Sequence, residues 1–159
     1  MIDEELHALS RRVGDWLAAR GATLACAESC TGGWVAQTVT ATAGSSGWFD
    51  RGFVTYSNEA KQELLGVAAA TLARHGAVSE ETVREMVAGT LAHSRARYAL
   101  AVSGVAGPGG GTAAKPVGMV CLAWGERGGE VRSETVRFAG DRTGIRRQAV
   151  IRALAELMT

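Results

Sequence analysis

The chain has 159 residues, of which 47% are hydrophobic and 21% are charged, and its formal net charge is +1. A charge so close to zero gives no basic field of the kind that binds nucleic acid, and no apolar run approaches the roughly 20 residues of a membrane-spanning helix. We therefore expect a globular protein with neither a nucleic-acid nor a membrane partner. The N-terminus is acidic where a secretory signal would be basic, which favours a cytoplasmic location.

Helices are expected to alternate with strands along the first two thirds of the chain, and a strand pair then precedes a last helix. In chain order, the predicted helices cover residues 3–20, 32–42, 58–65, 69–74, 80–94 and the segment after Asp141. The predicted strands cover residues 22–27, 50–56, 98–102, 117–125 and 130–138. This order predicts one domain over residues 1–159, with an α/β fold: a layered α/β/α sandwich around a mixed, partly parallel sheet.

Reactive side chains follow three of the predicted strands. Ser29 comes after the first strand, Tyr56 and Lys61 come after the second, and Ser103 and Gly104 come after the third. In open α/β sheets, ligands bind outside the carboxyl ends of the strands. If these three strands are parallel neighbours, the sequence predicts that the five residues share one binding site.

The turn after the first strand carries two candidate nucleophiles. Ser29 would be exposed on a sharp strand-to-helix turn, and the amides of Thr31, Gly32 and Gly33 would stabilise an oxyanion beside it. The structural alternative is that Ser29 or Thr31 only caps the following helix. Cys30 is the rival nucleophile, but no histidine lies nearby in the sequence to activate it.

Lys61 is the candidate base, because the histidines are scattered and a serine–lysine pair is a known alternative to serine–histidine. The dipole of the predicted helix, together with burial, would lower its pKa towards a useful range. Tyr56 would lie beside it and relay or donate a proton. The alternative for Lys61 is a solvated surface cation. Glu28 either orients a polar group of the substrate or only favours the start of the helix.

A glycine-rich segment follows the third strand and reads SGVAGPGGGT over residues 103–112. Its many backbone amides are typical of a nest for phosphate or carboxylate, and the alternative is a flexible surface loop. The three cysteines include no CxxC pair, and no histidine adjoins them at metal-ligand spacing. We therefore expect no disulfide framework, no metal site and no cofactor.

Six segments together resemble the CinA C-terminal domain family. They occur in the family's order and spacing and span most of the chain. They are AESCTGG (27–33), AGSSGWFDRGFVTYSNEAK (43–61), HGAVSEETV (75–83), SGVAGPGGG (103–111), KPVGMV (115–120) and GDRTGIRRQA (140–149). One departure is Ser103, which stands where many relatives have threonine and keeps the hydroxyl.

The resemblance implies an α/β enzyme that hydrolyses the carboxamide of nicotinamide mononucleotide in pyridine nucleotide salvage. The family's catalytic serine, tyrosine and lysine fall on Ser29, Tyr56 and Lys61, which are the residues that the strand ends also select. Residues 28–33 are expected to contact the substrate around the reacting carbonyl. The alternative function is a non-catalytic nucleotide- or phosphate-binding module, which would use the same glycine loops without needing Lys61.

The substrate phosphate needs backbone amides or cations, and several parts of the chain offer them. The candidates are Ser45, Ser46, Ser103, Gly104, Gly107, Arg142 and Arg146. We also expect a homodimer, with Trp48 and Phe49 as a candidate interface patch beside a glycine–serine turn.

Overall fold

Five strands form one mixed sheet in the computed structural model, which describes residues 2–159 and leaves Met1 outside the described residues. The strand order is β2-β1-β3-β4-β5. The first three strands are parallel, and β4 and β5 are antiparallel to their neighbours. The bounds are β1 Leu24–Glu28, β2 Phe49–Val54, β3 Tyr98–Gly104, β4 Met119–Glu126 and β5 Val131–Arg137. The carboxyl ends of β1, β2 and β3 therefore meet at one end of the sheet.

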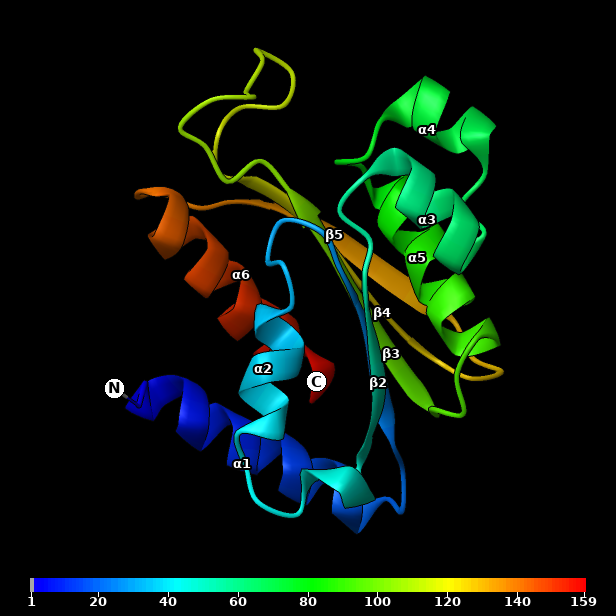
Figure 1. Ribbon diagram of the computed structural model, residues 1–159, viewed down its shortest axis with the longest axis vertical. Coiled ribbons are helices and arrows are strands. Elements are labelled where there is room, and N and C mark those ends of the chain that lie inside the picture. The colour runs from blue at the N-terminus through cyan, green and yellow to red at the C-terminus, as the bar shows by residue number, and fades with distance from the viewer. Residues whose placement is uncertain (1) are drawn as a thin grey trace.

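Helices cover both faces of this sheet (Figure 1). One face carries α1 (Glu4–Ala19), α2 (Trp34–Thr40) and α6 (Arg142–Leu157), and the other carries α3 (Asn58–Leu65), α4 (Ala69–His75) and α5 (Glu80–Ala92). Separate apolar clusters fill the two interfaces. Because both faces are covered, β1 is buried along its whole length. The predicted α/β/α sandwich around a mixed sheet is confirmed.

Side-chain caps start the helices that carry or flank the site. Ser57 accepts a hydrogen bond from the Ala60 amide at the start of α3, and Asp141 accepts one from the Gly144 amide at the start of α6. Ser79 caps α5 in the same way. These caps satisfy amides that would otherwise have no partner in the first turn.

Three predictions need correction. The strand predicted at 98–102 continues through Gly104, since Ser103 and Gly104 pair with β4. The strand predicted at 50–56 ends at Val54, because Thr55 and the residues after it lead into the cap of α3. Trp48 is only 7% exposed and packs in the core against Gly14, so it is not part of a surface patch. The homodimer itself stays a prediction.

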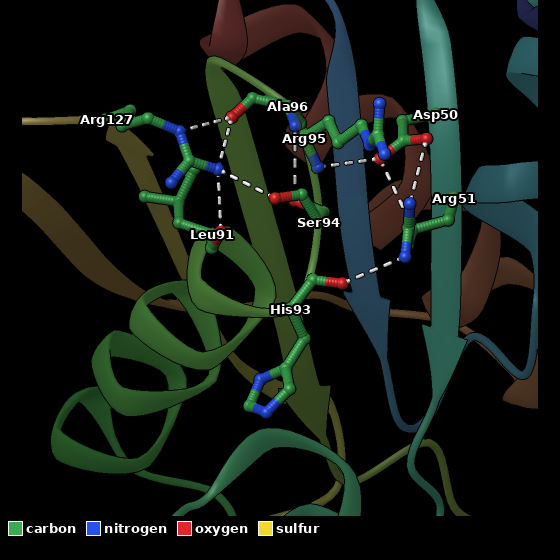
Figure 2. Close-up of polar contacts among 8 residues, drawn as sticks. All are labelled: Asp50, Arg51, Leu91, His93, Ser94, Arg95, Ala96 and Arg127. Atoms are coloured by element: carbon green, nitrogen blue, oxygen red, sulfur yellow. Dashed lines mark hydrogen bonds and ion pairs between the residues drawn. The ribbon is translucent and has the colours of Figure 1, made fainter.

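A polar cluster closes the amino end of the parallel strands (Figure 2). The Arg127 guanidinium donates to the carbonyl oxygens of Leu91, Ser94 and Ala96, which end α5 and lead into β3. At the start of β2, the Asp50 carboxylate accepts hydrogen bonds from the Arg51 side chain and the Arg95 amide. We call the side chains of Asp50, Arg51 and Arg127 the amino-end cluster.

Candidate active site

A small pocket opens at the carboxyl ends of the parallel strands. Its volume is about 200 Å³, and its lining includes residues from all three strand ends and from the start of α6. The lining residues are Ser29, Cys30, Tyr56, Ala77, Val78, Ser103, Gly104, Ala106 and Arg142. Pockets for drug-sized ligands usually measure about 300–1,000 Å³, so this one fits a ring with its substituent rather than a whole nucleotide.

Lys61 contacts Ser29, which is one of the residues that line this pocket. Lys61 Nζ lies 3.1 Å from Ser29 Oγ, and the lysine side chain is 0% exposed. Lys61 is therefore not a solvated surface cation. Ser29 is only 8% exposed, whereas the sequence suggested an exposed turn. The difference arises because α3 brings the lysine over the serine, so the pair is buried together.

Burial lowers the pKa of Lys61, because desolvation disfavours the charged form. Within residues 2–159, no carboxylate forms an ion pair with it. Its Nζ donates instead to the carbonyl oxygens of Thr55, at 2.7 Å, and Tyr56, at 3.4 Å. A neutral amine has two hydrogens and one lone pair. If the two carbonyls take the hydrogens, the lone pair is left for the Ser29 hydroxyl.

Glu28 serves the fold rather than the pocket. The last residue of β1 points to the face opposite Ser29, where its carboxylate accepts hydrogen bonds from the Val35 and Ala36 amides. It also accepts one from the Thr31 hydroxyl at 2.5 Å. This buried carboxylate accepts hydrogen bonds from amides at the start of α2 that have no acceptor within the helix. The structure therefore favours the second of the two roles considered for Glu28 and removes those helix-start amides from any oxyanion site.

Other amides of the same turn are free to bind an oxyanion. The Ser29 amide donates to Val102 O in β3, and the Gly32 amide donates to Ser29 O. Among residues 2–159, the amides of Cys30, Thr31 and Gly33 have no hydrogen-bond acceptor on another residue. Backbone amides next to a nucleophile are typical donors to an oxyanion. Gly32 and Gly33 allow the turn, since their φ angles are 59° and 102°.

Cys30 is a poor nucleophile in this setting. The residue is buried, and burial raises the pKa of its thiol to about 11. The reactive form of a cysteine is the thiolate, which such a pKa makes rare at neutral pH. The choice between the two candidate nucleophiles therefore favours Ser29.

Tyr56 and Arg142 form the outer rim of the pocket. The Tyr56 side chain is 63% exposed, and its hydroxyl accepts a hydrogen bond from Arg142 at 3.4 Å. Arg142 also donates to the carbonyl oxygen of Gly107 at 2.8 Å, which ties α6 to the glycine-rich segment. Among residues 2–159, no hydrogen bond joins the Tyr56 hydroxyl to Ser29 or Lys61.

Two sets of predicted phosphate ligands lie away from the pocket. Ser45 and Ser46 form a short 3₁₀ helix just before β2, at the amino end of the parallel strands. Arg146 supports the nucleophile turn from behind, because it donates to the carbonyl oxygens of Cys30 and Thr31. Arg142 and the end of β3 therefore remain as the candidates that line the pocket.

The sequence reading gave no role to the apolar wall of the pocket. Ala77 and Val78 line it from the connection between α4 and α5, and they lie inside the segment HGAVSEETV. In the sequence that segment stands out only for its family resemblance, since two small apolar residues in a loop carry no chemical signal of their own.

Within residues 2–159, no three His, Cys, Asp or Glu side chains gather closely enough to hold a metal ion. In the same range, no helix is both long and apolar enough to cross a lipid bilayer.

The fold and the pocket together define an α/β protein with a buried serine–lysine pair, which is an arrangement suited to nucleophilic attack on a carbonyl. Residues 6–159 match the CinA C-terminal domain, and the chain belongs to that family. The family resemblance seen in the six sequence segments is thus confirmed.

Individual relatives match almost from end to end. The chain is 56% identical over 157 residues to the nicotinamide-nucleotide amidohydrolase PncC of Escherichia coli strain K12, covering 99% of this chain and 95% of that protein. It is 51% identical over 155 residues to PncC of Pseudomonas putida, covering 98% and 96%. Among solved structures, the competence/damage inducible protein CihA from Agrobacterium tumefaciens superposes with a TM-score of 0.96 at 46% identity, covering 99% of this chain and 96% of that one.

Proposed function

We propose that this chain hydrolyses the carboxamide of nicotinamide mononucleotide, releasing nicotinic acid mononucleotide and ammonia. The observation that carries the proposal is the buried Lys61 amine, 3.1 Å from the Ser29 hydroxyl and without an acidic partner in residues 2–159. The names of relatives that match nearly the whole chain support the choice of substrate. A module that only binds nucleotides would have no use for a buried amine aimed at a serine.

In the first half of the reaction, neutral Lys61 takes the Ser29 proton and Oγ attacks the carboxamide carbon. The amides of Cys30 and Thr31 are suited to stabilise the oxyanion that forms. The tetrahedral intermediate collapses, the C–N bond breaks, and the Lys61 proton leaves with ammonia. An acyl ester on Ser29 remains.

In the second half, a water molecule gives one proton to Lys61 and attacks the ester carbonyl. Ser29 then leaves as the alcohol by taking that proton back, and the carboxylic acid is released. The substrate's pyridinium ring favours both halves, since it withdraws electrons from the carbonyl. Its positive charge also disfavours a second positive charge on Lys61.

The rest of the nucleotide extends beyond the pocket, because the pocket holds little more than the ring. Arg142 stands on that rim and carries the charge that a phosphate needs. We further propose that the enzyme works in the cytoplasm, in the salvage of pyridine nucleotides.

Ammonia release from nicotinamide mononucleotide tests the proposed function. Nicotinamide and nicotinamide riboside are the matched controls, because the first lacks ribose and phosphate and the second lacks only phosphate. We expect turnover of the mononucleotide and much weaker turnover of both controls. Equal turnover of free nicotinamide would contradict the substrate assignment, and no turnover of any of the three would contradict the proposed activity.

A further inference from the structure

Thr55, whose carbonyl oxygen accepts a hydrogen bond from Lys61 Nζ, carries a buried hydroxyl without a hydrogen-bond partner among residues 2–159. Thr55 is 0% exposed, and its Oγ1 is the one buried side-chain nitrogen or oxygen in residues 2–159 that makes no hydrogen bond. Burying a hydroxyl without a partner costs free energy that a valine of the same shape would not cost. Such an atom calls for an explanation, and functional sites are where such costs gather.

The strand register places Thr55 on the same face of the sheet as Ser29. The last parallel pair joins Glu28 to Val54, and the Thr55 amide extends this ladder by donating to Glu28 O at 2.8 Å. Thr55 therefore lies opposite Ser29, and side chains at matched positions of parallel strands share a face. Phe53, two residues earlier, packs with the cluster under α3 and α5, which is the face from which Lys61 comes.

The reaction changes the number of acceptors that Lys61 needs. As a neutral amine, Lys61 has two hydrogens for the two carbonyls that Nζ already contacts, those of Thr55 and Tyr56. After it takes the Ser29 proton it has three hydrogens, while Ser29 Oγ is bonded to the tetrahedral carbon and is a weak acceptor. Until that proton passes to the leaving nitrogen, the ammonium lacks one acceptor in a site that burial shields from water.

We propose that Thr55 is a positioning residue whose hydroxyl accepts the third hydrogen of the Lys61 ammonium during turnover. The Thr55 carbonyl already holds Nζ at 2.7 Å, and rotation about the Thr55 Cα–Cβ bond moves the hydroxyl between three staggered positions without releasing that contact. No covalent bond to Thr55 forms or breaks. The proton moves from Ser29 Oγ to Lys61 Nζ and then to the departing ammonia. This inference rests on the proposed function.

Two substitutions separate the hydroxyl from the shape of the side chain. Thr55→Val keeps the shape and removes the hydroxyl, so we expect a melting temperature no lower than that of the wild type. We expect kcat to fall about ten-fold to a hundred-fold with KM unchanged, since one hydrogen bond to a charge that exists only after attack contributes on that scale. Thr55→Ser keeps the hydroxyl and should restore most of the lost kcat with a lower melting temperature, since it removes a buried methyl group.

Thr90→Val is the matched control. Thr90 is also a buried threonine, but its hydroxyl donates to Met86 O within α5, away from the pocket. We expect its kcat to match the wild type. If Thr55→Val keeps wild-type kcat, or if Thr55→Ser is as slow as Thr55→Val, the positioning role is wrong.

A second readout does not depend on the substrate. Labelling of Ser29 by a sulfonyl fluoride also transfers the serine proton to Lys61, so Thr55→Val should slow labelling by a factor similar to its loss of kcat. Slowed labelling in a protein that does not turn over nicotinamide mononucleotide would overturn the proposed substrate and keep the role of Thr55. Unchanged labelling of Thr55→Val in an active enzyme would overturn the role of Thr55 alone.

Discussion

The two ends of the parallel strands use their cations in opposite ways: the arginines at the amino end are exposed, and the lysine at the carboxyl end is buried. In the amino-end cluster, Arg127 meets three carbonyl oxygens and Arg51 meets a carboxylate (Figure 2). At the carboxyl end, Lys61 is buried with two carbonyls and a serine hydroxyl, and Thr55 Oγ1 has no hydrogen-bond partner among residues 2–159. Saturated hydrogen bonding fixes a loop in place, whereas incomplete hydrogen bonding leaves groups available for chemistry. The amino end of the strands therefore contributes stability, and the carboxyl end carries the reactive groups.

The largest effect should follow removal of the nucleophile. Ser29→Ala should lower kcat at least about a thousand-fold while substrate binding is nearly retained, because only the covalent step needs the hydroxyl. Ammonia release and a binding titration with nicotinamide mononucleotide measure the two quantities. Near-wild-type turnover by this variant would place the reaction elsewhere.

Lys61→Met should also be nearly inactive, and it should change how stability depends on pH. Because burial lowers the pKa of Lys61 in the folded protein, the unfolded chain binds more protons between that pKa and about 10.4. The stability contribution of Lys61 therefore rises with pH through this range. We expect the melting temperature of Lys61→Met, relative to the wild type, to be highest below the folded-state pKa of Lys61 and to fall as the pH rises from that pKa towards about 10.4.

Arg127→Met is the matched change in the amino-end cluster. It removes a cation that donates to three carbonyls, and we expect a loss of about 1 kcal/mol, because the exposed part of the guanidinium is screened by water. This corresponds to a fall of about 2–4 °C in melting temperature. The kcat should stay at the wild-type value. A large loss of kcat in this variant would break the division of roles between the two ends.

The smallest effect should come from Cys30. Since burial raises the pKa of its thiol to about 11, Cys30→Ala should keep kcat within about three-fold of the wild type. A steady-state assay of both proteins measures this directly. An inactive Cys30→Ala together with an active Ser29→Ala would make the enzyme a thiol amidase.

Sequence patterns predicted the meeting of Ser29 and Lys61 because parallel strands bring their carboxyl ends together whatever the packing details. They left two roles open for Glu28, because strand alternation decides which face a side chain serves and a difference of one residue reverses it. Glu28 faces α2 and caps it, while Ser29 faces the pocket.

The positions of Trp48 and Arg146 could not be predicted from their own segments, because they depend on contacts with residues far away in the sequence. Trp48 follows a glycine–serine turn, which suggested a surface patch, but it fills the space beside Gly14 of α1. Arg146 lies near the start of α6 as a phosphate ligand would, but it contacts the back of the nucleophile turn, 115 and 116 residues away in the sequence. No pattern within a single segment signals either contact.

The most direct test of a neutral lysine base compares Lys61→Arg with Lys61→Ala. Arginine keeps the positive charge but cannot be deprotonated in a protein, so it cannot take the Ser29 proton. We predict that ammonia release by folded Lys61→Arg is as low as that of Lys61→Ala, at least about a thousand-fold below the wild type. A Lys61→Arg enzyme that keeps its kcat and changes only KM would contradict the serine–lysine mechanism and leave the residue a role in binding alone.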